Sequence, residues 1–219
     1  MESGQDAVHV ARMKRAAFFY AERHNLKVFP LYAATIGGDC HCPPTSSTRR
    51  HRPPGREDTC SNPGKHPCTP HGVLDATNEI ARVNAWWSTQ YPGANIGIAC
   101  GASNLLVLDI DPRNGGDAAL AAWEAEFGAL PTTGPRATTG GGGAHLVWNR
   151  HTIGAHEKFA AHFAPGVDIK CDGGYIVAAP STTDKGPYAW DPQRPLRFPL
   201  ADLPPAARDS LSVTRPGGL

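Results

Sequence analysis

The sequence has no run of about 18 consecutive apolar residues, the length that a membrane-spanning helix needs. Residues 1–10 are polar and mixed, and they lack the charged and then apolar layout of a secretory signal. No internal repeat is found. The formal net charge is only +1, which leaves nucleic-acid binding open because a local basic patch is sufficient for it. These absences argue against a membrane, secreted or repeat protein, and they predict a cytoplasmic location.

The six cysteines are spread too unevenly for a secreted disulfide scaffold. Cys100 and Cys171 lie in apolar, strand-like sequence, whereas the other four fall in one His-rich stretch. That stretch, residues 37–72, has seven Pro, five Gly and almost no large apolar side chains. It cannot bury enough surface to fold by hydrophobicity alone, so it is either disordered or held by a metal.

Tetrahedral zinc would supply the missing folding energy. The spacing predicts a structural Zn²⁺ site in this insert, because four protein ligands leave no open position for catalysis. The predicted ligands are Cys40, Cys42, Cys60 and His66, with Cys68 as the alternate. His41, His51 and His71 remain further alternates.

Hydrophobic patterning predicts helices and strands through the rest of the 219 residues. The expected helices span 7–25, 78–90 and 117–127. The expected strands span 26–31, 95–100, 105–111, 145–148, 167–171 and 175–179. The last two strands are expected to form a hairpin across residues 172–174, and residues 131–143 are expected to be a loop.

Asp109 and Asp111 lie at the end of the most apolar predicted strand. Side chains at i and i+2 share one face of a strand, roughly 6.6 Å apart. Two carboxylates so placed repel each other and favour a cation between them. A pair of divalent ions about 4 Å apart is the usual device for in-line nucleotidyl transfer. Asp111-Pro112 also fits an ordinary turn, which is the competing interpretation.

Four successive glycines, residues 140–143, precede His145 and its predicted strand. Glycine allows backbone N–H groups to approach phosphates closely, and His145 would donate to a triphosphate oxygen. No Gly-Lys-Ser/Thr follows, so the segment is not a P-loop. The alternative is a flexible hairpin approach with a buried, hydrogen-bonded histidine.

In order and spacing, these motifs resemble the bifunctional primase–polymerase (Prim-Pol) domain of the archaeo-eukaryotic primase superfamily. The resemblance covers about residues 10–195. The segments that carry it are Trp87, Pro92, Asn95–Ile98, Leu106–Asp111, Gly141–His145, Gly166–Lys170 and Gly173–Ser181, with Pro63–Pro67 in the insert.

The resemblance implies a role for particular residues. Asp109 and Asp111 would be the catalytic Mg²⁺ or Mn²⁺ ligands, and Asp168 the third carboxylate. Asp172, in a predicted turn, is the runner-up for that third position. His145 and Lys170 would contact the nucleotide phosphates. Gly143 stands where the family has a serine, so no side-chain hydroxyl is available there.

The resemblance also implies an α/β (α+β) fold, with a mixed, mainly antiparallel sheet flanked by helices. We expect one catalytic domain over residues 1–205, including the insert 37–72, and a linker over 206–219. The expected activity is template-directed DNA primase or polymerase chemistry with two catalytic metal ions. The expected partners are single-stranded DNA template and primer, nucleoside triphosphates and a helicase module in the same or another chain.

Two rival functions remain open at the sequence level. One is a non-catalytic, zinc-dependent DNA-binding module of a replication protein, in which the insert matters and Asp109 does not. The other is a metal-dependent nuclease that uses the same carboxylates, with His145 recruited to activate water.

Overall fold

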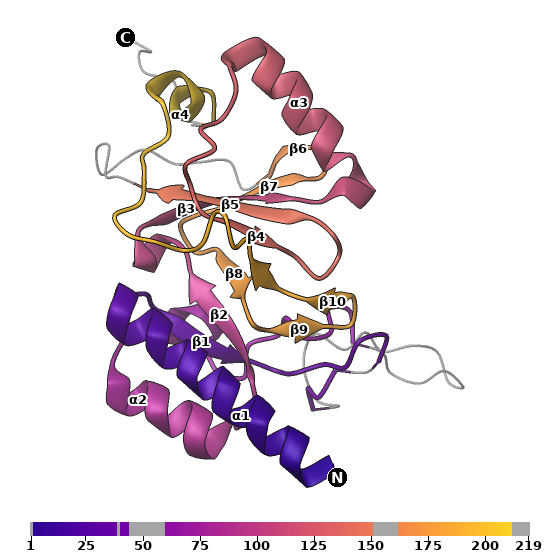
Figure 1. Ribbon diagram of the computed structural model, residues 1–219, viewed down its shortest axis with the longest axis vertical. Helices are drawn as coiled ribbons and strands as arrows, with labels where there is room; N and C mark the ends of the chain where they lie inside the picture. Colours follow the sequence, from indigo (N-terminus) through magenta and orange to yellow (C-terminus); the bar gives the residue numbers. More distant parts are fainter. Residues whose placement is uncertain (1, 39, 44–59, 151–161, 212–219) are drawn as a thin grey trace. The chain divides into compact units, whose positions relative to one another are not determined.

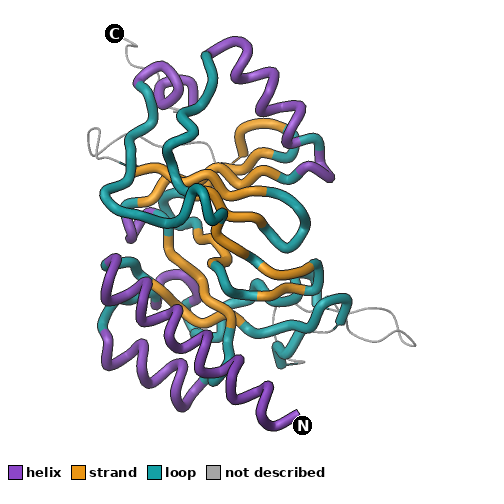
Figure 2. The backbone as a smooth tube through the Cα atoms, viewed as in Figure 1, coloured by secondary structure: helices purple, strands orange, loops and turns teal. Residues whose placement is uncertain are grey.

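The computed structural model describes residues 2–38, 40–43, 60–150 and 162–211. These residues form two compact units (Figures 1 and 2). Unit 1 comprises residues 1–99 and 176–189, and unit 2 comprises residues 100–175 and 190–219. The predicted α+β class with mainly antiparallel strands is confirmed. The single domain predicted for residues 1–205 stays a prediction.

Unit 1 is built on a three-stranded sheet in the order β1-β2-β8, in which β1 and β2 are antiparallel. Its main elements are α1 (Glu2–Phe18), the π-helical turn η1 (Phe19–Arg23), β1 (Val28–Leu31), α2 (Ile80–Ala85), the π-helical turn η3 (Trp86–Gln90), β2 (Asn95–Ala99) and β8 (Tyr175–Ala178). Shorter elements are η2 (Gly72–Asp75), β9 (Thr182–Thr183) and β10 (Gly186–Pro187), the last two forming a hairpin.

Helices form at both predicted segments of unit 1, 7–25 and 78–90, although the first begins earlier, at Glu2. On α1 and η1, Met13, Ala17 and Tyr20 recur at helical spacing and are buried. On the second helix Trp87 is fully buried, and its indole N–H donates to the Ala94 carbonyl over 2.9 Å. Burying each large apolar side chain contributes about 1.5–3 kcal/mol, so these residues tie the helices to the unit's core.

Unit 2 contains a six-stranded sheet in the order β11-β4-β5-β3-β7-β6. From β4 to β6 every neighbouring pair is antiparallel. The strands are β3 (Leu105–Ile110), β4 (Arg136–Thr138), β5 (Ala144–Asn149), β6 (His162–Ala164), β7 (Val167–Lys170) and β11 (Ala189–Trp190). The helices are η4 (Gly101–Ser103), η5 (Pro112–Asn114), α3 (Gly116–Phe127) and α4 (Pro205–Leu211).

Alternation along β3 assigns the two faces of this sheet. Leu106, Leu108 and Ile110 belong to one buried cluster with Trp123 of α3 and Leu211 of α4. The other residues of β3, including Asp109, therefore point to the opposite face. The helices cover one face, and the carboxylate lies on the other.

The predicted hairpin between residues 167–171 and 175–179 is wrong. β7 pairs with β3 and β6, whereas β8 joins the sheet of unit 1. The turn at Gly173–Gly174 is hydrogen-bonded instead to the segment that connects β2 with β3. The Cys100 N–H donates to the Gly174 carbonyl, and the Gly101 N–H donates to the Cys171 carbonyl. The chain thus leaves one sheet for the other at this turn.

Two further expectations differ from the structure. Residues 131–143 were expected to be a loop, but they contain β4, which pairs with β5. The linker expected from residue 206 begins inside helix α4, whose Ala207 and Leu211 are buried. Residues 212–219 and His51 lie outside the described residues, as does most of the middle of the insert. Among the described residues, no helix is long and apolar enough to cross a membrane.

Two glycines bring the chain very close together at the end of β3. Asp111 N–H donates to the Gly166 carbonyl over 2.7 Å, and Gly116 N–H donates to the Asp111 carbonyl over 3.0 Å. A Cβ on Gly116 would lie 2.4 Å from the Gly166 carbonyl oxygen and 2.8 Å from that of Asp111. No side chain fits there unless the backbone shifts.

We therefore predict that Gly116→Ala destabilises the protein, although alanine gains about 1 kcal/mol of helix propensity over glycine. The clash is with backbone atoms, and overpacking costs about 1–3 kcal/mol. Urea unfolding measures the net change, and Ala118→Ser, at an exposed position of the same helix, is the control. A Gly116→Ala protein as stable as the wild type would contradict this packing.

Candidate functional site

Three chemically active side chains lie in one row across the sheet of unit 2. In the antiparallel register, Asp109 of β3 is directly opposite His145 of β5 on one side and Asp168 of β7 on the other. Directly opposed residues share a face, with Cβ atoms about 4.5–5.5 Å apart. The register therefore puts Asp168 on the same face of the sheet as Asp109.

His145 is buried beside the Asp109 carboxylate. Its ring is almost inaccessible, whereas Asp109 is only partly buried. Nε2 lies 3.6 Å from Oδ1 of Asp109, which is longer than a hydrogen bond. The histidine is thus held at one end of the row, next to a carboxylate that is partly accessible to solvent.

Asp168 is paired with the lysine two residues further along its own strand. Lys170 Nζ donates to Asp168 Oδ2 over 2.8 Å. The runner-up acid, Asp172, lies beyond the far end of β7 and is ion-paired with Arg150. Because Asp168 faces Asp109 and Asp172 does not, the geometry favours Asp168 as the third carboxylate.

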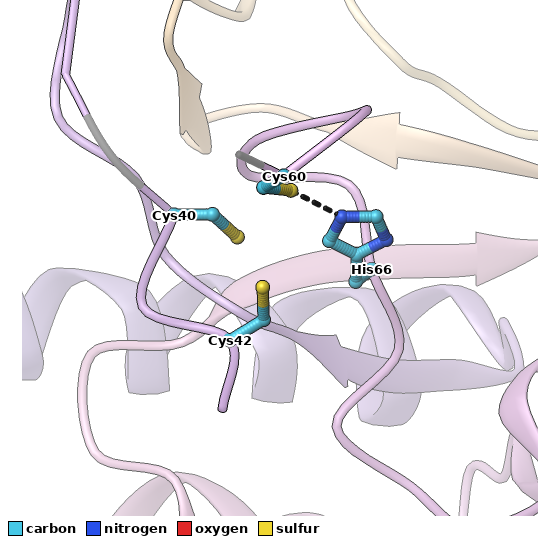
Figure 3. A group of neighbouring side chains, drawn as sticks. All are labelled: Cys40, Cys42, Cys60 and His66. Atoms are coloured by element: carbon cyan, nitrogen blue, oxygen red, sulfur yellow. Dashed lines mark hydrogen bonds between the residues drawn. The ribbon is translucent and has the colours of Figure 1, made fainter. Parts of the chain in front are cut away.

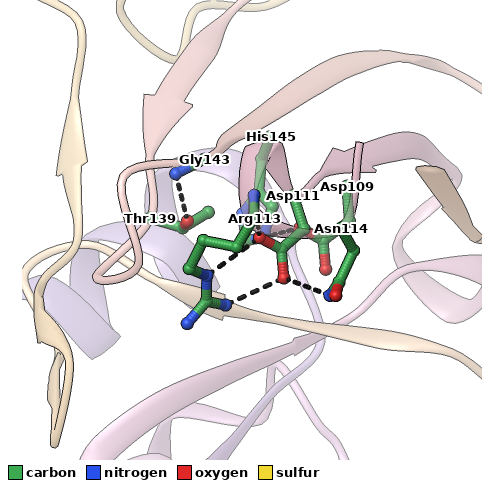
Figure 4. A network of polar contacts seen from close by, with 7 residues as sticks. All are labelled: Asp109, Asp111, Arg113, Asn114, Thr139, Gly143 and His145. Atoms are coloured by element: carbon green, nitrogen blue, oxygen red, sulfur yellow. Dashed lines mark hydrogen bonds and ion pairs between the residues drawn. The ribbon is translucent and has the colours of Figure 1, made fainter. Parts of the chain in front are cut away.

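Asp111 caps the turn η5 that follows β3 (Figure 4). Its carboxylate accepts from the backbone N–H of Arg113 over 3.1 Å, from the Arg113 guanidinium over 2.9 and 2.8 Å, and from the Asn114 amide over 3.0 Å. The competing turn interpretation is therefore also correct locally. Asp111 is at once a helix cap and a member of the acidic group.

The glycine segment before His145 is shaped by packing. A Cβ on Gly143 would lie 2.1 Å from the Ile110 carbonyl oxygen, so only glycine fits this backbone. Gly143 N–H donates to Thr139 Oγ1 over 3.1 Å (Figure 4). Sequence reasoning missed Thr139, Arg113 and Asn114. For Arg113 and Asn114, the turn-forming sequence after Asp111 was the only feature that could have indicated them.

A second group of side chains lies in unit 1, within the insert. The Sγ atoms of Cys40, Cys42 and Cys60 and a ring nitrogen of His66 all lie within 4.8 Å of one another (Figure 3). Backbone bonds to and around β1 bring the two halves of the group together: His41 N–H donates to the Ala33 carbonyl, and Tyr32 N–H to that of His66. Three thiols and one imidazole fit tetrahedral zinc.

Burial raises the pKa of the Cys60 thiol to about 12, and it raises that of Cys40 and lowers that of His66. Cys40 and Cys60 are therefore protonated at neutral pH without a metal, and Zn²⁺ would have to displace those protons. The alternate Cys68 is not in the group. His71 bonds to Asp75 instead.

Among the described residues, the Cys/His group is the only one of three or more such side chains that could hold a metal ion as it stands. Asp109, Asp111 and Asp168 lie on or next to neighbouring strands, but their carboxylates do not form such a group in this structure. Each is engaged with a nearby basic side chain. Divalent cations would therefore have to compete with these contacts.

The structure is thus a mixed α+β protein. It has an acidic row on an antiparallel sheet and a separate Cys₃His group. Residues 17–206, most of the chain, match the Prim-Pol family, described as bifunctional DNA primase/polymerase, N-terminal. The chain belongs to this family, which implies DNA primase and polymerase activity. A search of curated proteins found no match.

We predict that the purified protein contains about one zinc ion per chain. Cys40→Ser and Cys60→Ser should lower the zinc content sharply, because each removes one of four ligands. They should also lower the melting temperature by about 5 °C or more. Metal analysis and thermal melting test this.

Cys68→Ser is the matched control, since this thiol lies in the same insert but outside the group. It should retain zinc. Loss of zinc in Cys68→Ser together with retention in Cys60→Ser would show that the ligand set is wrong.

Proposed function

We propose that this protein is a template-directed nucleotidyltransferase that makes or extends DNA primers during replication. The observation that carries this proposal is the row of His145, Asp109 and Asp168 on one face of the sheet. The row supplies hard oxygen ligands and a phosphate-binding histidine next to each other. The substrates are nucleoside triphosphates and a single-stranded DNA template with its primer. A helicase module in the same or another chain is a further expected partner.

The donor set fits two divalent cations, Mg²⁺ or Mn²⁺. Asp109 and Asp168 face each other directly, and two opposed carboxylates are unfavourable without a cation. Carboxylates are the ligands that these hard ions prefer. Asp109, Asp111 and Asp168 would hold them. When bound, such ions activate the 3′-hydroxyl and neutralise charge on the triphosphate.

The protein's own basic groups would orient the nucleotide. His145 is fixed by burial and would donate to a phosphate oxygen. Lys170, on the same face as Asp168, would supply a positive charge to the triphosphate. Positioning and charge neutralisation would then provide most of the rate. The Cys₃His group would act as a structural zinc site, because four protein ligands leave no open position.

Primer extension with Mg²⁺ or Mn²⁺ tests the assignment of the acids. Asp109→Asn and Asp168→Asn keep the shape of the side chain and remove its charge. We expect each to reduce extension by about 100-fold or more, with zinc content and melting temperature near those of the wild type.

Asp172→Asn is the matched control, because Asp172 also belongs to this part of the chain but lies beyond the far end of β7. It should retain extension activity. Wild-type protein that cleaves DNA but never extends a primer would overturn the proposal in favour of a nuclease. Activity lost only in Asp172→Asn would mean that the third acid is misassigned.

A second prediction concerns His145. Since this side chain would contact the nucleotide and not the template, His145→Ala should raise the KM for the nucleoside triphosphate by about 10-fold. The Kd for single-stranded DNA should change little. Steady-state kinetics and fluorescence anisotropy measure the two quantities, and the opposite pattern would remove this role from His145.

A further inference from the structure

Arg113 holds the Asp111 carboxylate in a side-on pair. Its Nε donates to Oδ1 over 2.9 Å and its Nη2 to Oδ2 over 2.8 Å. Two parallel N–H···O bonds are the strongest geometry that a guanidinium and a carboxylate can adopt. One of the two acids in the Asp-x-Asp motif is therefore occupied by a cation of the protein itself.

The glycine loop supports this arginine. A Cβ on Gly141 would lie 2.9 Å from the guanidinium carbon of Arg113, so the guanidinium lies directly against this glycine. The loop is closed by its own bonds, because the amides of Gly142 and Gly143 both donate to Thr139. The hydrogen bonds of those two amides are therefore made within the loop. The group that the glycine loop contacts next to Asp111 is the Arg113 guanidinium.

Each of the three acids is matched to one basic side chain. Asp109 has His145 at 3.6 Å, Asp168 has Lys170 at 2.8 Å, and Asp111 has Arg113 at 2.8 Å. In the proposed function, His145 and Lys170 bind phosphates. Arg113 lies beside its acid as Lys170 does, and it makes two hydrogen bonds to that acid.

We propose that Arg113 competes with divalent cations for Asp111 and, once displaced, binds the triphosphate of the incoming nucleotide. This inference rests on the proposed function. A guanidinium suits the second task because its planar fork matches phosphate oxygens bidentately. The side chain is 47% exposed, so it can leave Asp111 without disturbing the core.

Mn²⁺ binding in the absence of nucleotide tests the competition directly, by electron paramagnetic resonance titration of the whole protein. Arg113→Gln removes the competing charge, so the Kd for Mn²⁺ should fall by about 3- to 10-fold. Arg113→Lys should lie between, since a lysine cannot form the bidentate pair. An unchanged or weaker Mn²⁺ affinity in Arg113→Gln would overturn the proposal and leave the arginine a purely structural role.

Gly141→Ala perturbs the pair without changing any charge. The added methyl group would push against the guanidinium, and no positive φ restricts this position. It should tighten Mn²⁺ binding in the same direction as Arg113→Gln but less. Arg208→Gln, on α4 and paired with Asp209, is the control and should leave the Mn²⁺ affinity unchanged.

A double-mutant cycle isolates the pair. With Asp111→Asn the carboxylate is gone, so adding Arg113→Gln should no longer tighten Mn²⁺ binding. An equal tightening in both backgrounds would show that Arg113 acts through general charge and not through Asp111, which contradicts the proposal.

The second half of the proposal is tested with a non-hydrolysable nucleoside triphosphate at saturating Mn²⁺. Arg113→Gln should weaken its binding by about 10-fold or more, while binding of the corresponding nucleoside stays unchanged. If the wild-type protein binds neither Mn²⁺ nor the triphosphate, the proposed function fails. If it binds both and Arg113→Gln alters neither, only the present inference fails.

Discussion

The strand register around β3 is the constraint on which the site depends. Leu106, Leu108 and Ile110 must face α3 and α4 because they form the core of unit 2 with Trp123 and Leu211. Asp109 is then obliged to face the other way, opposite both His145 and Asp168. A slip of one residue would turn Asp109 into the core and take Leu106, Leu108 and Ile110 out of the cluster. Burial of the apolar residues of β3 thus fixes the position of Asp109 and of the residues opposite it.

Glycine contributes to this arrangement through close backbone packing. Gly143, Gly116 and Gly166 each lie where a Cβ would come within 2.4 Å of a backbone atom. They let neighbouring segments close tightly around Ile110 and Asp111, where β3 ends. At Gly143 this backbone has no room for any side chain. The glycine run has a structural role that is separate from phosphate binding.

The sequence revealed those parts of the structure that local pattern determines. The apolar run before Asp109 identified β3, and the spacing of Cys40, Cys42, Cys60 and His66 identified the Cys/His group. The choice of strand partner was not accessible in the same way. The segments around Gly173 look like a hairpin locally, but non-local pairing sends them to different sheets. Arg113 was missed because its significance comes from contacts with Asp111 and Gly141, which depend on the folded loop.

Charge balance links the acids to the proposed chemistry. The three carboxylates lie on or next to β3 and β7 and would repel each other. The fold offsets this by pairing Asp111 with Arg113 and Asp168 with Lys170. Divalent cations would neutralise the same carboxylates, so their binding would free Lys170 and Arg113 from that task. These basic groups would then face the site just as the negatively charged triphosphate arrives with its metal. Neutralisation within the metal-free site and phosphate recognition in the loaded one are thus two uses of the same two side chains.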